Sequence, residues 1–287
     1  MDQKRFVKAC FIASTLMLIA AGCGPGRTAA ATQPTPVAFD PAQSDEKSLA
    51  AIDEMMTALG GAAAWNQVKQ VRWELRYLQN DQLQGLIRHS WDIWNGRHRW
   101  EFISTDTYNK WQQEGGDGAP PFTRAMYNLF DREGKGVVLS PLGERAVASE
   151  RDIFVAEAYR SWQRDSYQLA MFFKLKDPGV KLQYVGERDD LQDYCKSGCL
   201  DIKVTFDSAV GNDYYHVYLS KDTKMPVVVE RYEEGRSIYL AVTKWVTVNG
   251  LQVPAEYKNI GPNQVFQLDK IQIGEPDDEL YVMPLGG

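Results

Sequence analysis

Apolar and polar residues alternate along three consecutive stretches of the chain, and a period of two is typical of β-strands with one buried face. The alternation runs through residues 71–77, 87–93 and 98–102. Asn95-Gly96, a dipeptide that favours tight hairpin turns, separates the second stretch from the third. The pattern therefore predicts three consecutive antiparallel strands.

Two other stretches carry apolar residues at helical spacing, so that each forms one stripe. The first covers residues 49–59, with Asp45 or the preceding serine as its cap and Gly60-Gly61 as its end. The second begins at a cap formed by Ser149 and ends before Pro178-Gly179. We predict one helix in each stretch.

The rest of the chain is predicted to form further strands and one long loop. The strand candidates are 125–130, 137–139, 180–187, 199–207, 213–220, 225–233, 237–248, 251–259 and 264–273. Residues 104–124 lack a period and are rich in Gly and Pro, as in a long loop. Because no β–α–β alternation is present, these candidates should form an antiparallel sheet, which we expect to have about ten or eleven strands. A sheet that large must curl or split, so we expect a strongly curved sheet with helices on its concave side, an α+β fold that is mainly β.

The N-terminal part of the chain has the pattern of a targeting segment followed by a linker. Three basic residues precede an apolar run that ends at Gly22-Cys23, the layout of a secretory signal peptide. We expect this signal at residues 1–22. Residues 23–43 contain four prolines among small and polar residues, which predicts a flexible linker. Residues 44–287 are then expected to form a single domain.

The segment Ile19-Ala20-Ala21-Gly22-Cys23 resembles the lipobox of bacterial lipoproteins. The resemblance implies that the signal is cut before Cys23 and that the thiol of Cys23 carries two acyl chains, such as palmitate. Two or three such chains anchor a protein far better than one does. Ordinary cleavage near Ala21 and an uncleaved anchor are the alternatives. In lipoproteins of enteric type Gly24 would favour the outer membrane, so the expected location is the cell envelope, facing the periplasm.

The charge of the chain limits its partners. It contains 32 basic and 38 acidic residues, a net charge of −6. Nucleic-acid binding requires a basic face, so nucleic acid is excluded as a partner. Removal of residues 1–22 takes away three basic residues and one acidic residue, which leaves −8 over 265 residues. Such a body is not attracted to anionic headgroups, so membrane attachment would rest on the lipid anchor.

Two of the four cysteines remain after the signal and the lipid site are set aside. They are Cys195 and Cys199, separated by Lys-Ser-Gly. In an exported protein such a pair favours a disulfide, which would fasten the tip of a hairpin. A redox motif would have two intervening residues, and a metal site would need further ligands nearby.

Four turn and strand motifs of the chain together resemble those of a known family. They are Ala58-Leu59-Gly60-Gly61, Val68-Lys69-Gln70-Val71, Lys221-Asp222-Thr223-Lys224-Met225-Pro226 and Val248-Asn249-Gly250-Leu251-Gln252-Val253-Pro254. Over roughly residues 45–285 the chain resembles the outer-membrane lipoprotein-sorting superfamily, the LolA/LolB-like half-barrels. The resemblance implies an incomplete antiparallel barrel with helices as a lid and a cavity for acyl chains. It also implies a lipid or an acylated lipoprotein as partner, for carriage, insertion or sensing.

An acyl-chain cavity needs an apolar lining with few polar groups, and the strands supply candidates. The candidate ligand-binding residues are Trp73, Leu75, Trp91, Trp100, Phe102, Phe206, Tyr218, Leu240 and Trp245. Alternation places Trp245 on the opposite face of its strand from Leu240. Such stripes also form ordinary cores. The alternative is therefore an envelope protein–protein interaction module with a filled cavity and no lipid cargo.

No motif predicts catalysis, a cofactor or a metal site. His89 and His98 are expected to face one another near a hairpin, without a nucleophile, and His216 is expected to be an ordinary strand residue. The sequence contains no phosphate loop, dinucleotide fingerprint or zinc-binding helix. An exported hydrolase would require a cluster of titratable groups with perturbed pKa values in the main cleft.

Overall fold

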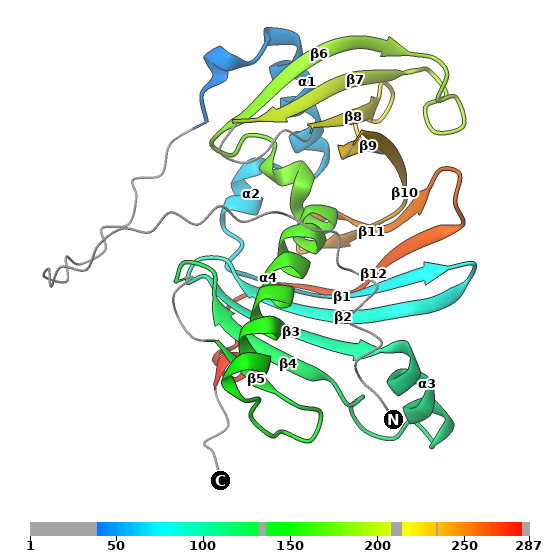
Figure 1. Ribbon diagram of the computed structural model, residues 1–287. Helices are drawn as coiled ribbons and strands as arrows, with labels where there is room; N and C mark the ends of the chain where they lie inside the picture. The colour runs from blue at the N-terminus through cyan, green and yellow to red at the C-terminus, as the bar shows by residue number, and fades with distance from the viewer. Residues whose placement is uncertain (1–38, 132–135, 208–213, 234, 283–287) are drawn as a thin grey trace, which may run out of the picture. The chain divides into compact units, whose positions relative to one another are not determined.

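One antiparallel sheet forms the framework of the computed structural model, which describes residues 39–131, 136–207, 214–233 and 235–282 (Figure 1). In these residues the sheet has 12 strands. They are β1 Gln70–Gln79, β2 Gln82–Asp92, β3 Arg97–Ser104, β4 Thr123–Asn128, β5 Val137–Leu139, β6 Val180–Arg188, β7 Cys199–Phe206, β8 Tyr214–Ser220, β9 Pro226–Glu233, β10 Arg236–Val248, β11 Leu251–Asn259 and β12 Gln264–Gly274. The helices are η3 Pro41–Gln43, α1 Glu46–Ala58, α2 Ala62–Asn66, α3 Thr105–Gln113, α4 Ala148–Ala170, η4 Met171–Lys174 and η5 Asp278–Tyr281.

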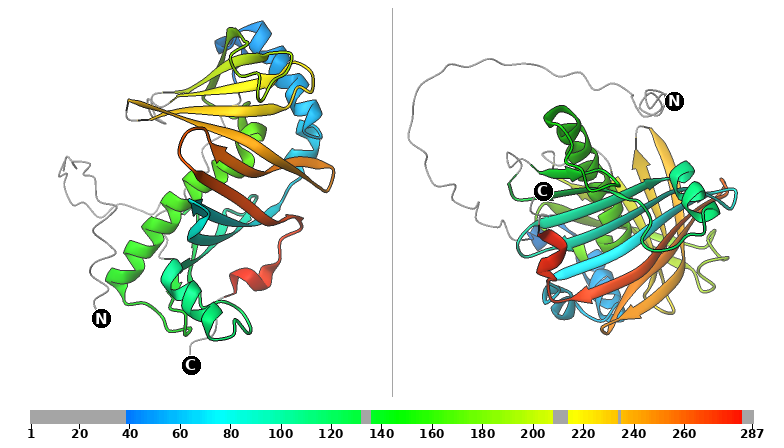
Figure 2. Two further views of the ribbon diagram at one scale, coloured as in Figure 1. Left: turned by 90° about the vertical axis from the view of Figure 1, so that its right-hand side faces the viewer. Right: turned by 90° about the horizontal axis from the view of Figure 1, so that it is seen from below.

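The order of the strands explains where the long helix lies. The order is β5-β4-β3-β2-β1-β12-β11-β10-β9-β8-β7-β6, so β5 and β6 are the two edges. These edges are consecutive in the chain, and α4 with η4 connects them. At 1.5 Å per residue, the 23 residues of α4 extend about 35 Å. The helix therefore crosses the side toward which the sheet curls (Figures 1 and 2).

The two faces of the sheet differ in chemistry. On β1, Val71, Trp73 and Leu75 belong to the main core cluster, together with residues of α1, α4 and η4. Arg72 and Glu74 point to the other side, because successive residues of a strand alternate. We call the side of Trp73 the concave face and the side of Glu74 the outer face.

The predicted fold class is confirmed, and the predicted strands agree with the observed ones within two residues at their ends, except that β2 begins at Gln82, five residues before the predicted start at residue 87. The sheet is antiparallel, mainly sequential and not closed, with 12 strands where ten or eleven were expected. The first helix begins after Asp45, whose carboxylate accepts a hydrogen bond from the Ser48 N–H at 2.8 Å. The second helix begins one residue earlier than its predicted Ser149 cap, after Val147, which has no side chain able to cap it.

Residues 104–124 contain a helix, so the prediction of one long loop is wrong. The Ser104 hydroxyl caps α3 by accepting a hydrogen bond from the Thr107 N–H at 3.3 Å, and Asp106 favours the first turn electrostatically. Beyond the helix, Phe122 is buried against Leu86 and Ile103. Because these two residues follow the outward alternation of β2 and β3, the segment covers part of the outer face.

The N-terminal predictions fall mostly on residues that the structure does not describe. The expected signal peptide, Cys23 and the linker up to residue 38 lie outside the described residues. Phe39 packs against the main core, and η3 follows it, in the last residues of the expected linker. The folded unit therefore begins before residue 44.

Gly60 is expected to tolerate no side chain, because it ends α1 against the β10–β11 turn. Its φ is +104°, and an added Cβ would lie 2.4 Å from the Gly250 carbonyl oxygen. The Gly60→Ala variant should lose about 3 kcal/mol of unfolding free energy, measured by urea denaturation. Gly61→Ala is a matched control, because Gly61 has a φ of +97° with no atom within 4 Å of an added Cβ. Equal losses in the two variants would show that the contact with Gly250 has no effect.

Candidate functional site

Most of the predicted cavity residues are brought together on the concave face, where they form core. Trp73, Leu75 and Trp91 lie in the main cluster. Trp100 and Phe102 lie in a neighbouring cluster with Ala125, Val138 and Ala158, under the N-terminal half of α4. Phe206, Leu240 and Trp245 are partly buried and pack against the main cluster.

Tyr218 does not lie on the face expected of a cavity residue, and Trp245 does not lie on the face that alternation suggested. Tyr218 is buried on the outer face, in a separate cluster with Cys195, Cys199 and Val228. Its inclusion among residues of a concave cavity is therefore wrong. Trp245 packs on Phe172 of η4 with ring centroids 5.8 Å apart. A break in the β10–β11 register between Val242 and Trp245 brings this indole to the concave side, where strict alternation excluded it.

The disulfide between Cys195 and Cys199 fixes the loop from β6 to β7. The two Cα atoms are 5.6 Å apart, and both residues are buried. Beside it the Tyr218 hydroxyl donates to Glu230 at 2.6 Å, and His216 contacts Asp201 at 2.6 Å. This outer cluster orders the β6–β9 end of the sheet.

A buried polar network joins α4 to β2, β3 and β4 at the centre of the concave face. Asp165 of α4 and His89 of β2 are fully buried, with 3.1 Å between Oδ2 and Nε2. His89 Nδ1 lies 3.1 Å from His98 Nε2, and His98 Nδ1 lies 2.9 Å from the Tyr127 hydroxyl. The expected contact between His89 and His98 is thereby confirmed, whereas sequence reasoning missed Asp165.

Only one arrangement of protons satisfies this network with both imidazoles neutral. The Asp165 carboxylate can only accept, so His89 must donate from Nε2. His89 Nδ1 then accepts from His98 Nε2–H, and His98 Nδ1 accepts from the Tyr127 hydroxyl. A proton added to His89 would place its Nδ1–H against the Nε2–H of His98, and a proton added to His98 would require the Tyr127 hydroxyl to accept instead of donate. The chain of hydrogen bonds therefore runs in one direction, from the sheet to the helix.

Burial and these contacts set the pKa values of the network. Burial lowers the pKa of His98 well below its ordinary value, and the neighbouring charge of a protonated His89 lowers it further. Burial also lowers the pKa of His89, although Asp165 opposes the change. Burial by itself would raise the pKa of Asp165, but the hydrogen bond from His89 and the charge of Arg164 hold it below its ordinary value. The stable state has neutral histidines and an ionised aspartate.

The same network includes a serine, yet its geometry is not that of a nucleophile. The Ser161 hydroxyl donates to Asp165 Oδ2 at 2.6 Å and accepts from the Trp100 indole N–H at 3.1 Å. An activated serine donates to a histidine instead. In the described part of the chain, no group of three or more His, Cys, Asp or Glu is placed to hold a metal ion.

Beside the network, large aromatic side chains of the concave face keep part of their surface exposed. Tyr167 of α4 stacks on Tyr215 with centroids 5.8 Å apart, and Phe206 packs edge-on against both rings. Tyr77 of β1 stacks on Phe266 of β12, the strand next to β1 in the sheet, with ring centroids 5.1 Å apart. All five aromatic side chains are only partly buried. We call Tyr77, Tyr167, Phe206, Tyr215 and Phe266 the aromatic face.

Three buried polar atoms in this region have no hydrogen-bond partner among the residues that the structure describes. They are Nε1 of Trp73, Nε1 of Trp162 and Oε1 of Gln168. At helical spacing Trp162 and Gln168 lie on either side of Asp165, so they flank the network on α4. An unpaired buried donor or acceptor costs about 1–3 kcal/mol. A ligand with a polar atom near α4 would remove part of this cost.

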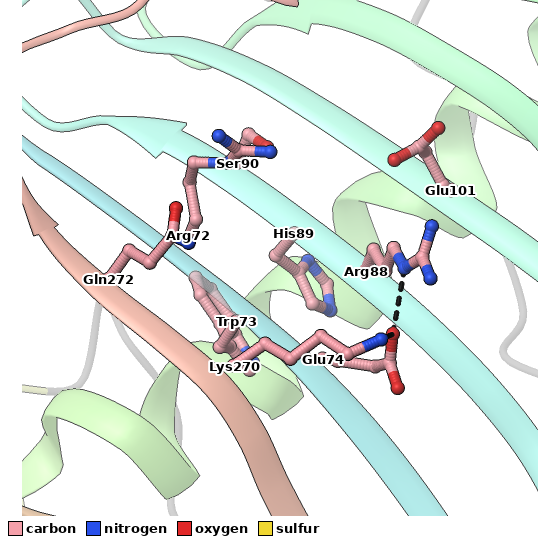
Figure 3. A pocket seen from close by; sticks show the side chains of 9 residues that line it. All are labelled: Arg72, Trp73, Glu74, Arg88, His89, Ser90, Glu101, Lys270 and Gln272. Carbon is pink, nitrogen blue, oxygen red and sulfur yellow. Dashed lines mark hydrogen bonds and ion pairs between the residues drawn. The ribbon is translucent and has the colours of Figure 1, made fainter. Parts of the chain in front are cut away.

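On the outer face, a polar pocket of about 150 Å³ lies between β12, β1, β2 and β3 (Figure 3). Glu74 is buried there, and its carboxylate accepts hydrogen bonds from Arg88 at 2.8 Å and from Lys270 at 3.1 Å. Burial by itself would raise the pKa of Glu74, but these bonds hold it below its ordinary value. Beside it, an adjoining pocket of about 380 Å³ reaches Tyr108 and Trp111 of α3.

These features define an open half-barrel whose concave face is covered by a long helix. No protein-family model matches the chain, and no curated protein matches it. Among solved structures it is similar to a LolA superfamily protein from Nitrosomonas europaea, with 10% identity, a TM-score of 0.43 and coverage of 82% of this chain and 97% of that one. That protein belongs to the superfamily that the sequence resemblance suggested.

Two further solved structures are similar to the chain. One is MucB in the Pseudomonas aeruginosa MucA/MucB complex, with 15% identity, a TM-score of 0.27 and coverage of 80% of this chain and 60% of that one. The other is a conserved protein from Thermus thermophilus, with 9% identity, a TM-score of 0.30 and coverage of 84% and 96%. The chain thus spans less than two thirds of the MucB chain. No helix among the described residues is long and apolar enough to cross a membrane.

Proposed function

We propose that the chain is a lipid-anchored protein of the bacterial cell envelope that holds acyl chains of a lipid or lipoprotein on its concave face, beside α4. The aromatic face carries the proposal. Its five rings lie on the side covered by α4, and they keep exposed apolar surface there. An apolar chain laid along them would gain about 25 cal/mol for each Å² removed from water.

The central network limits where such a chain can lie. Asp165, His89 and His98 fill the concave face under the middle of α4. The acyl site is therefore assigned to the sector between the C-terminal half of α4 and strands β7, β8, β12 and β1. The unpartnered Trp73 Nε1–H suits the carbonyl oxygen at the head of an acyl chain, and the unpartnered Gln168 Oε1 suits a donor such as an amide N–H or a glycerol hydroxyl.

The first test is lipid extraction of the purified chain followed by mass spectrometry, with displacement of a fluorescent fatty acid as the binding measurement. We expect Tyr215→Glu to weaken fatty-acid binding at least tenfold, because it places a charge beside the apolar chain. Tyr214→Glu is the matched control on the outer face, since Tyr214 is equally half-buried and stacks on Tyr232. Equal effects in both variants, or no lipid and no binding at all, would refute the acyl site. The same mass spectra give the mass of the N-terminal peptide, and an unmodified Cys23 would refute the anchor.

A protein partner in the envelope is the second candidate, favoured by an apolar surface at the start of α4. Leu142, Val147 and Ile153 are 86%, 63% and 64% exposed. Exposed apolar groups that lie near one another in the chain are typical of protein contacts. This function predicts that extraction yields no lipid and that Ile153→Glu abolishes the partner's binding without changing stability.

A further inference from the structure

The outer pocket places one row of polar side chains across three strands. Arg72 of β1 is paired with Gln272 of β12 and with Ser90 of β2, and directly paired residues project on the same face. The next row holds Glu74 and Arg88, also paired across β1 and β2. The pocket lies between the two rows (Figure 3).

The charge around this pocket is opposite to that of the whole chain. Three cations line it together with two carboxylates: the cations are Arg72, Arg88 and Lys270, and the carboxylates are Glu74 and Glu101. The lining therefore carries one net positive charge, on a chain whose net charge is −6. The field in the pocket attracts an anion.

The two acidic side chains that line the pocket already have partners. Glu74 Oε1 accepts from Arg76 and Oε2 from Arg88 and Lys270. Glu101 Oε1 accepts from Arg99 at 2.7 Å and from Arg124 at 2.9 Å. These carboxylates are neutralised by cations, so they do not oppose an incoming anion as free charges would.

The donors of the first row have no good acceptor among the described residues. The hydroxyl of Ser90, a residue 4% exposed, and the side-chain amide of Gln272 make no hydrogen bond in that part of the chain. Arg72 reaches Asp277 only at 4.0 Å, and that carboxylate is half exposed. Because these donors have no acceptor and lie beside excess positive charge, they favour a ligand that only accepts hydrogen bonds.

We propose that the outer pocket binds a phosphate group, held by Arg72, Ser90 and Gln272 with Lys270 at its rim. The guanidinium of Arg72 can donate two parallel hydrogen bonds to one edge of the anion. The Ser90 hydroxyl and the Gln272 amide come from the two strands on either side of β1, so three separate donors can surround the anion. A tetrahedral anion with four acceptor oxygens meets such donors better than a planar carboxylate does. The group comes either as free phosphate or as a phosphomonoester headgroup of a lipid.

The test is calorimetric titration of the full chain with inorganic phosphate, at low and constant ionic strength. Arg72→Gln should weaken binding about tenfold, and Ser90→Ala should weaken it severalfold. Arg236→Gln is the control, because this exposed arginine lies on β10, away from the pocket. Circular dichroism verifies that each variant is folded.

Further titrations separate the sources of the anion. Acetate should bind at least tenfold more weakly than phosphate. Vesicles containing phosphatidic acid that bind the wild type, but not Arg72→Gln, identify a lipid headgroup as the ligand. Phosphate binding without vesicle binding identifies the free anion. Absence of binding in both titrations, equal affinity for acetate, or an equal loss in Arg236→Gln would overturn the proposal.

Discussion

Replacement of Asp165 by alanine is expected to lower the free energy of unfolding by about 4 kcal/mol. The aspartate is the only acceptor at the end of the hydrogen-bond chain, and it receives His89, Ser161 and Arg164 together. Without it, the buried N–H of His89 and the hydroxyl of Ser161 lose their partner, and each such loss costs about 1–3 kcal/mol. The guanidinium of Arg164 is half exposed, so water can replace the hydrogen bonds that it makes to the aspartate. The measurement is urea denaturation at pH 7.5.

A control on the same helix separates the network from a general effect of charge. Glu157 is exposed and pairs with Arg160 three residues later, so Glu157→Ala should change stability by at most about 0.5 kcal/mol. Asp165→Asn should fall between the two variants, because an amide oxygen can still accept from His89. A loss below about 1 kcal/mol in Asp165→Ala would mean that the network does not hold α4 to the sheet.

The pattern of apolar positions was sufficient to predict the sheet, because each of its strands buries one face. Val71, Trp73 and Leu75 show the principle, since all three lie in the core while Arg72 and Glu74 lie on the outer face. The α3 helix has no buried residue. Its only signals are local, namely the Ser104 cap and the charges of its first and last turns. Hydrophobic periodicity therefore could not detect it.

Only part of the buried network on the concave face could be predicted from the sequence. His89 and His98 lie on strands joined by the Asn95-Gly96 turn, and their contact follows from the register of the hairpin, in which they are diagonal neighbours. Asp165 belongs to a different element, far away in the sequence. One signal was available: Ser161 and Asp165 are four residues apart and interrupt the apolar stripe of α4. A polar pair on the buried side of a helix indicates a partner on the opposing surface.

The outer pocket could not be predicted, because it depends on register rather than on residue type. Alternating Arg72, Glu74 and Arg76 have the pattern of any solvated strand face. The pocket exists because β1 and β12 shift register between Arg72 and Glu74, which lets Lys270 reach the Glu74 carboxylate. The same kind of irregularity placed Trp245 on the concave side. β-Bulges therefore decide the positions at which strict alternation fails.

Acidification is expected to destabilise the fold from about pH 6.5 downward, the ordinary pKa of histidine. The pKa values of His89 and His98 are lowered in the folded chain, chiefly by burial. Below pH 6.5 the unfolded chain therefore binds protons that the folded chain does not bind. Stability falls as pH falls wherever the unfolded state binds more protons, by about 1.4 kcal/mol per pH unit for each proton. With both histidines involved, the slope is at most about twice that value.

Two further groups must be considered in assigning this slope. The pKa of Asp165 is also lowered in the folded chain, but the unfolded aspartate takes up its proton only near pH 4, so it adds to the loss at lower pH. His216 lies at the other end of the sheet, on the outer face beside Asp201. A His216→Gln variant removes this third imidazole, and the slope that remains between pH 6.5 and 5 is assigned to the buried pair.

The experiment is urea denaturation of the wild type and of His216→Gln from pH 7.5 to pH 5, at constant ionic strength. The expected result is a fall in unfolding free energy that steepens below pH 6.5 in both proteins. Stability that is constant or rises on acidification would mean that His89 and His98 already carry a proton in the folded state. The one-directional hydrogen-bond chain from Tyr127 to Asp165 would then be wrong, because a protonated imidazole has no acceptor nitrogen to offer it.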